Sequence, residues 1–422
     1  MSENPSSAVA DSATGPKPRR TVPLLIALIV MNIGGYAAIA GILSVLLPSQ
    51  VQIAAGADAV STLGLITGIS AIASVSVPPI VGLLSDRTRS RWGRRTPWIF
   101  FGGLAGAAAM LLLGTAQTVP LLLIGWFLVQ GTLNIGLNVI LAVIADGVPL
   151  NRRGLASALQ GLGLPVGSII GVQIGANLIS DVVVAYVILI AVFVVASTVA
   201  AVLVREPASD AAVVEAKRRD PLLRSFSSIF SSLRDRDYRW VLIARAVLYL
   251  GYNMVSVYGL YILQDYIAMP ADITPAAGVA TMTTINLGTL VVTSLVIGPL
   301  VDRFGRHKRW VLFTGVLLAF AVFIPLFVPT WTGMLVHSAV LGLAFGAYLG
   351  VDLALAAITM PRTGDSGRDM GVFHIALNLP QVIAPFVASV AVTSLGGYRA
   401  LFALSGAFAL IGALAVLRVR RP

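Results

Sequence analysis

The sequence predicts an all-α membrane protein with about twelve transmembrane helices in two six-helix bundles. Composition, recurring apolar runs and one-sided basic residues support this prediction. Of the 422 residues, 57% are hydrophobic and only 11% are charged, and the mean hydropathy is +0.91. A soluble domain would carry about 25% charged residues to cover its surface. The missing charge indicates that much of the surface faces lipid.

The apolar runs give the number of helices. A membrane-spanning helix needs about 20 largely apolar residues. The sequence contains twelve such runs, at 22–47, 61–84, 97–116, 120–145, 154–179, 182–204, 240–264, 278–301, 309–328, 332–358, 370–394 and 399–417. A long polar stretch divides them into two sets of six. We therefore expect five parts, namely a disordered cytoplasmic tail (1–20), a bundle (21–204), a cytoplasmic linker (205–239), a second bundle (240–418) and a cytoplasmic tail (419–422).

The basic residues predict the orientation. If the helices alternate in direction, 27 of the 29 Lys and Arg residues fall on one side of the membrane. Cytoplasmic loops carry the excess of Lys and Arg, so this side is cytoplasmic and both termini are inside. We therefore expect a multi-pass protein of the inner, cytoplasmic membrane. The same distribution explains the net charge of +11 without a nucleic-acid partner.

Several classes of chemistry are disfavoured. The chain has no cysteine, and its three histidines cannot build an ordinary zinc site alone. No nucleophile–base pattern indicates an enzyme, and no Walker-type loop indicates nucleotide hydrolysis. We expect no cofactor. The predicted partners are the lipid bilayer, a small-molecule substrate and a coupling ion, and the chain is expected to be a monomer.

An internal repeat relates the two halves. The segment Gly82–Arg87 reads GLLSDR, and Gly298–Arg303 reads GPLVDR. Residues 82–98 resemble the helix 2–3 signature of the major facilitator superfamily. Their TRSRWGRR-x-P form is similar to that of the glycoside–pentoside–hexuronide cation symporters and the plant sucrose carriers. The resemblance implies the major facilitator fold and secondary transport by alternating access.

The repeated motif is interpreted as a conformational latch that does not touch substrate. Gly82 would let two helices approach closely. Asp86 sits at a helix end, where it can accept from backbone N–H groups or pair with the nearby arginines. The expected latch residues are Gly82, Asp86, Arg87, Arg94, Arg95, Gly298, Asp302 and Arg303.

Ionisable residues inside the membrane are costly, so each is a functional hypothesis. Asp146 and Asp352 are the expected proton-coupling residues, and Asp146 also matches an aspartate that the sucrose carriers tie to proton coupling. Asp146 could instead form a structural ion pair with Arg152 or Arg153. Arg245 is long enough to reach the cytoplasmic surface from within its helix. We expect Asp146→Asn to abolish accumulation while exchange persists.

Polar side chains recur on single helix faces, which lipid-facing positions would not carry. Interhelical hydrogen bonds alone could explain many of them. Amides and tyrosines also suit a neutral polyhydroxylated solute, because amides donate and accept while aromatic faces stack on sugar rings. The expected substrate-binding residues are Asn32, Tyr36, Gln130, Asn134, Asn138, Tyr252, Asn253, His374, Asn378 and Gln381.

Three functions stay open. Helices 1 and 2 contain no acid, and the mid-helix 4 position is Asn138, so the sodium site of melibiose-type carriers is not expected. A proton-coupled sugar or glycoside symporter is favoured. The alternative is a proton-driven multidrug efflux carrier, because the glycines around Pro165 resemble an antiporter signature. A non-transporting membrane receptor is the third possibility.

Overall fold

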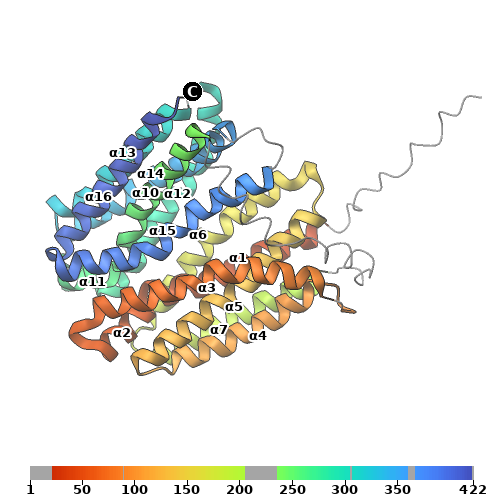
Figure 1. The fold of residues 1–422 in the computed structure, drawn as a ribbon. Coiled ribbons are helices and arrows are strands. Elements are labelled where there is room, and N and C mark those ends of the chain that lie inside the picture. Colours follow the sequence, from red (N-terminus) through yellow and green to blue (C-terminus); the bar gives the residue numbers. More distant parts are fainter. Residues whose placement is uncertain (1–20, 89, 205–234, 305–306, 360–365, 421–422) are drawn as a thin grey trace, which may run out of the picture.

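The computed structural model describes residues 21–88, 90–204, 235–304, 307–359 and 366–420. Within these ranges the chain is helical apart from short connections and one isolated β-bridge between Ala268 and Thr330. The helices form two bundles (Figure 1). The predicted N-terminal tail and nearly all of the predicted linker lie outside the described residues.

Over the described residues each bundle contains six long helices, and the first helix of each is interrupted. The N-terminal bundle consists of α1 (Thr21–Gly41) continued by η2 (Ile42–Leu46) and α2 (Leu47–Ala55), then α3 (Ala59–Arg87), α4 (Thr96–Gly114), α5 (Val119–Gly147), α6 (Arg153–Asn177) and α7 (Val182–Leu203). The C-terminal bundle consists of α10 (Arg236–Ser256) with α11 (Gly259–Asp265), then α12 (Pro275–Phe304), α13 (His307–Phe327), α14 (Trp331–Thr359), α15 (Ser366–Ser394) and α16 (Gly397–Ala415).

The twelve predicted spans correspond to these helices in order. The largest difference is in the first span, where the helix continues past Leu47 to Ala55 through the polar residues Ser49, Gln50 and Gln52. Hydropathy does not register a helix that continues through polar residues. Among the described residues, nine segments are long and apolar enough to cross a membrane, or ten if α10 and α11 count as one bent span.

Close contact between backbones holds α6 against α1 in the N-terminal bundle. A Cβ added at Gly163 would lie 2.5 Å from the Cβ of Asn32, and one at Gly167 would lie 2.5 Å from the carbonyl oxygen of Ile33. A Cβ at Gly171 would overlap the backbone of Ala37. Small residues allow such approach between membrane helices. The glycines around Pro165 therefore have a packing role in this fold.

The two bundles meet where α3 packs on α15 and α6 packs on α12. α1 begins and α16 ends at one end of the molecule. Hydrogen bonds join the two bundles near the opposite end. The hydroxyl of Tyr261 donates to the Pro48 carbonyl at 2.7 Å. The hydroxyl of Tyr258 donates to the Pro385 carbonyl of its own bundle at 2.9 Å, and the Val60 carbonyl of the N-terminal bundle lies 3.3 Å from the same hydroxyl. Both tyrosines lie at the 53° bend between α10 and α11, and Figure 1 shows α11 beside α2 and α3.

The contact between the bundles differs between the two ends of α3. A Cβ at Gly64 would lie 2.7 Å from both the Tyr258 hydroxyl and the Cβ of Ser389. At Gly82, near the other end of α3, it would meet no described atom within 4 Å. The close helix contact expected at Gly82 is thus absent in this conformation, because the bundles approach each other at the opposite end.

Candidate functional site

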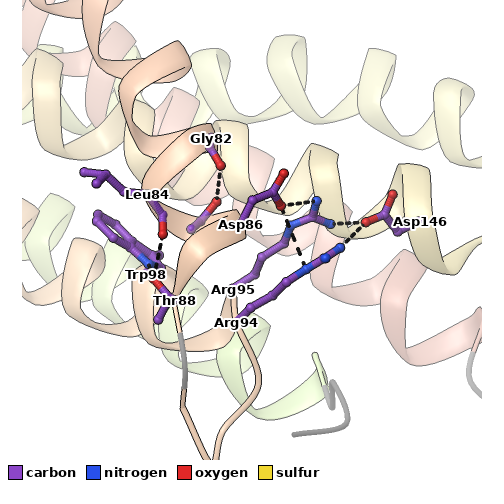
Figure 2. A network of polar contacts seen from close by, with 9 residues as sticks. Gly82, Leu84, Asp86, Thr88, Arg94, Arg95, Trp98 and Asp146 are labelled. Carbon is purple, nitrogen blue, oxygen red and sulfur yellow. Dashed lines mark hydrogen bonds and ion pairs between the residues drawn. The ribbon is translucent and has the colours of Figure 1, made fainter. Parts of the chain in front are cut away.

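Four charged side chains form a cluster at one end of the N-terminal bundle, which we call the latch cluster: Asp86, Arg94, Arg95 and Asp146. Arg95 donates to the Asp86 carboxylate at 3.2 Å and lies 2.8 Å from that of Asp146. Arg94 donates to Asp146 at 2.5 Å, and its Nε lies 3.9 Å from Asp86. Figure 2 shows the two arginines lying between the two carboxylates. The cluster ties the α3–α4 loop to the end of α5.

The loop between α3 and α4 holds the arginines in place. Gly93 has φ of 91°, a conformation that favours glycine, and it turns the chain back toward α4. The Trp98 indole N–H donates to the Thr88 hydroxyl at 2.8 Å, and that hydroxyl donates to the Leu84 carbonyl at 2.7 Å (Figure 2). The loop is therefore fastened at both ends, which fixes the two arginines relative to Asp86.

Asp146 joins this cluster instead of pairing with the residues that follow it. The sequence left open a structural pair with Arg152 or Arg153. The structure instead pairs it with Arg94 and Arg95 of the α3–α4 loop, while Arg153 donates to the Val148 carbonyl at 3.4 Å. The Asp146 side chain is 53% exposed. It therefore lies at the rim of the bundle, with about half of its side chain exposed.

A second charged pair lies inside the C-terminal bundle. Arg245 of α10 forms an ion pair with Asp352 of α14, and the two side chains are only 5% and 4% exposed. Arg245 does not reach the surface, contrary to one expectation from its position in the sequence. The hydroxyl of Tyr348 donates to the other oxygen of Asp352 at 3.0 Å. Both carboxylate oxygens are thus satisfied, as a buried charge requires.

Aromatic rings continue from this pair along α10 and α14. The Arg245 guanidinium carbon lies 5.1 Å from the ring centre of Tyr249. Tyr249 makes edge contacts with Phe345 at 5.4 Å and with Tyr348 at 6.0 Å. The next ring, Tyr252, stacks on Phe345 at 4.0 Å. We call this series of side chains on α10 and α14 the aromatic ladder. It runs from the buried ion pair to the half-buried ring of Tyr252.

The amides predicted to bind substrate donate to their own helices. Asn134 donates to the Gln130 carbonyl at 2.7 Å, and Asn138 donates to the Asn134 carbonyl at 2.8 Å. Asn253 does the same to Tyr249 at 2.8 Å. A primary amide has two N–H groups and one carbonyl, so each retains an acceptor and a donor for a second partner. These residues are half-buried and remain candidates for solute contact.

The remaining predicted site residues are spread over both bundles. Asn32 is 2% exposed and donates to the Leu28 carbonyl at 2.8 Å, so in this conformation it is a packing residue between α1 and α6. Tyr36 is half-buried, whereas Asn378 and Gln381 are exposed on α15. Of the predicted latch residues not in the cluster, Arg87 and Arg303 are exposed. The side chains of Asp302 and His374 are not among the described parts of the structure. The same is true of the environment of Gly298.

The ion pair between Arg245 and Asp352 could not be predicted from the sequence. The only signal was that polar and aromatic residues recur at helical spacing around each of them. Arg245, Tyr249 and Tyr252 recur on one face of α10, and Phe345, Tyr348 and Asp352 recur on one face of α14. Spacing shows that each set shares a face, but it does not show that the two faces meet.

Two bundles of six long helices, with half-buried amides in one and a buried ion pair in the other, have the architecture of a membrane carrier. The sequence profile of the Major Facilitator Superfamily matches residues 24–270 and 241–422. The chain belongs to this superfamily. It is therefore a multi-pass membrane transporter of the secondary type, and it is not an enzyme.

Curated relatives match over short segments. An uncharacterised symporter of Synechocystis sp. is 62% identical over 39 residues, which are 9% of this chain and 6% of the relative. A general alpha-glucoside permease of Schizosaccharomyces pombe is 27% identical over 120 residues, which are 25% of this chain and 22% of the relative. A lactose permease of Lactobacillus helveticus is 39% identical over 56 residues, 13% of this chain and 9% of the relative.

Solved structures match over almost the whole chain. The nucleoside transporter NupG superposes with a TM-score of 0.74 at 14% identity and covers 94% of this chain and 100% of its own. A peptide transporter POT in complex with alafosfalin gives 0.72 at 13% identity and covers 93% of each chain. These likenesses establish the fold.

Proposed function

We propose that the chain is a proton-coupled symporter that imports a small neutral hydroxylated solute, a sugar or a glycoside, across the cytoplasmic membrane. The observation that carries the proposal is the buried carboxylate of Asp352, paired with Arg245 between two membrane helices. Ionisable groups in such positions mark ion pathways and proton relays. No acid occurs in the first two predicted spans, which disfavours the sodium site of melibiose-type carriers.

Two features support a hydroxylated solute. Half-buried amides on α5 keep a donor and an acceptor for a second partner, and hydroxyl groups can satisfy both. The half-buried ring of Tyr252 suits the apolar face of a sugar ring. The names of the relatives agree with this class, since they include an alpha-glucoside permease and a lactose permease.

The latch cluster has a separate role in this proposal. Alternating access requires the two bundles to rock against each other around the solute. Asp86, Arg94, Arg95 and Asp146 fix the α3–α4 loop, which lies far from the hydrogen bonds that join the bundles at the opposite end. A group that stabilises one conformation over the other shifts their populations without touching solute. We assign the cluster this function.

The proposal is tested with purified protein in liposomes. A thermal-shift screen first identifies a ligand, because a solute that binds the native state raises its melting temperature. Uptake of that solute is then measured with and without an imposed pH gradient, acidic outside. We expect accumulation only with the gradient, and no effect of an equal sodium gradient. Accumulation driven by sodium, or release driven by the proton gradient, would refute proton symport.

The orientation is a separate proposal. We propose that both termini and the linker face the cytoplasm, because Lys and Arg concentrate on that side, and that the working unit is a monomer. Two reporters are fused after Pro422 in turn. The reporter that is active only in the cytoplasm should be active. The reporter that is active only in the periplasm should be inactive, and its activity would show that the C-terminus lies on the periplasmic side.

A further inference from the structure

One contact occurs in both bundles, between the start of the third helix and the residue at which the sixth helix ends. In the N-terminal bundle the hydroxyl of Thr96, in the first turn of α4, donates to the Val204 carbonyl directly after α7 at 3.0 Å. In the C-terminal bundle the ammonium group of Lys308, in the first turn of α13, donates to the Val419 carbonyl at 2.5 Å. Val419 follows η5 (Val416–Arg418), which continues α16. We call these two contacts the fasteners.

The internal repeat places the two donors at equivalent positions. Residues 93–96 read GRRT and residues 305–308 read GRHK, so Thr96 corresponds to Lys308. Each of the two acceptor valines is followed by an arginine. A threonine hydroxyl and a lysine ammonium group differ in size and charge, and what they share is the ability to donate a hydrogen bond. The feature that recurs in both halves is therefore the hydrogen bond to the carbonyl.

The acceptors are groups that need a partner. The last carbonyls of a helix have no partner within the helix. Val204 and Val419 are only 2% and 1% exposed, so water has little access to them. A buried carbonyl that loses its hydrogen bond is costly, and each donor therefore stabilises the position of the helix end that it binds.

The N-terminal fastener is directly connected to the latch cluster. Thr96 follows Arg95, which donates to Asp86 at 3.2 Å and lies 2.8 Å from Asp146. Because the backbone has only two soft dihedral angles per residue, anchoring Thr96 restricts where the side chain of Arg95 begins. The contact with Val204 thus ties the latch cluster, which joins α3 and α5, to α7 as well.

The C-terminal fastener includes contacts from a third element. We call residues 416–420 the strap. Its Arg420 backbone N–H donates to the Asp237 carboxylate in the first turn of α10 at 2.9 Å, and its Arg418 guanidinium carbon lies 5.2 Å from the ring centre of Trp240. The strap therefore connects the start of α10 to the start of α13, where the copy of the latch motif ends.

We propose that Thr96 and Lys308 are positioning residues, and that each ties the motif loop of its half to the end of the sixth helix so that the two move together. The inference rests on the proposed role of the latch cluster in the conformational change. It adds to that role two residues that touch neither solute nor the carboxylates of the cluster.

The N-terminal fastener is tested by the accessibility of Val204. The chain has no cysteine, so Val204→Cys supplies a unique buried thiol and keeps the backbone carbonyl. Thr96→Val should raise the rate at which a maleimide labels this thiol about 5-fold, because one hydrogen bond is lost. Thr115→Val is the matched control at the other end of α4, since the hydroxyl of Thr115 donates only within its own helix. It should leave the rate unchanged.

The C-terminal fastener is tested in the same way. Val419→Cys supplies the buried thiol, and Lys308→Met removes the donor while keeping most of the side-chain length. The labelling rate should rise at least about 10-fold, because hydrogen bonds from charged groups are the stronger ones. Arg309→Met is the control, since Arg309 is the next residue and is exposed. It should not change the rate.

Transport separates a positioning role from simple packing. Thr96→Val should slow solute exchange in liposomes at least about 3-fold, with solute affinity within about 3-fold. In an Asp86→Asn background it should slow exchange by less than about 1.5-fold further, because changes in one network are not additive. Thr96→Ser and Lys308→Arg keep a donor and should restore the wild-type rate. Lys308→Met should slow exchange as Thr96→Val does.

Two results would overturn the inference alone. Unchanged labelling of both thiols would mean that the donors do not hold the helix ends. Raised labelling with wild-type exchange, or with full additivity between Thr96→Val and Asp86→Asn, would reduce the contacts to packing. Wild-type exchange by Asp86→Asn itself would instead refute the latch role, whatever the thiols show. If Thr96→Val is not inserted into the membrane, Thr96→Ala takes its place in both measurements.

Discussion

The two bundles share a helix arrangement but differ in what joins their first and fourth helices. In the N-terminal bundle the contact between α1 and α5 is apolar, with the Met31 side chain packed on Gly136. In the C-terminal bundle the contact between α10 and α14 holds the Arg245–Asp352 ion pair. The ion pairs described above for the N-terminal bundle lie instead at one of its ends, in the latch cluster. One bundle therefore carries a cluster of ion pairs at its rim, and the other carries an ion pair in its interior.

This difference predicts that single substitutions act unequally on the two helix pairs. Arg245→Leu leaves Asp352 buried without its cation and should cost about 3–5 kcal/mol of stability. Met31→Leu keeps the volume of the matching N-terminal contact and should cost less than about 1.5 kcal/mol. Thermal unfolding of the purified variants in detergent compares them. Equal losses would mean that the ion pair contributes no more than an apolar contact.

A second prediction concerns how the N-terminal bundle holds together without such a pair. Gly171→Ala places a methyl group against the backbone of Ala37 and should cost about 1–3 kcal/mol, as overpacking does. The control is Gly161→Ala on the same helix, where an added Cβ meets no described atom within 4 Å. Melting temperatures of the two variants give the answer. If Gly161→Ala is the more harmful change, close contact with α1 is not what makes Gly171 necessary.

The latch cluster should affect rate more than stability. Asp86→Asn removes a charge that Arg94 and Arg95 share, and should slow transport about 10-fold, equivalent to about 1.4 kcal/mol. Solute affinity should stay within about 3-fold, because the cluster biases conformations and binds no solute. Arg87→Gln is the control, since Arg87 is exposed and outside the cluster. If both variants slow transport equally, the cluster is not the latch.

The smallest effect is expected where the bundles touch. Tyr261→Phe removes the 2.7 Å hydrogen bond to Pro48, worth about 1 kcal/mol, and should open this end about 5-fold more often. Tyr266→Phe is the control, because its hydroxyl donates to Pro325 within the C-terminal bundle. The chain has no cysteine, so Ser389→Cys supplies a unique thiol beside Gly64 at this contact. Its labelling rate should rise with Tyr261→Phe alone; a rise with Tyr266→Phe as well would show general loosening.

Much of the fold followed from local properties of the sequence. The apolar runs predicted the order of the twelve helices, because hydropathy is a property of each residue and its neighbours. The spacing of GLLSDR and its copy predicted the repeat, and the arginines after Asp86 predicted an ionic cluster. The helical extension beyond Leu47 was missed, since its residues are polar, and the bend after Ser256 leaves no clear mark in hydropathy.

What the sequence determined by itself is the class of protein, the helices and the faces on which the polar residues gather. Only the tertiary structure decided which of those faces meet. It paired Asp146 with Arg94 and Arg95 and not with Arg153, and it buried Arg245 against Asp352. The physical reason is that the rotation and register of each helix depend on packing against all of its neighbours. Residues 107 positions apart, such as Arg245 and Asp352, share no local signal of that contact.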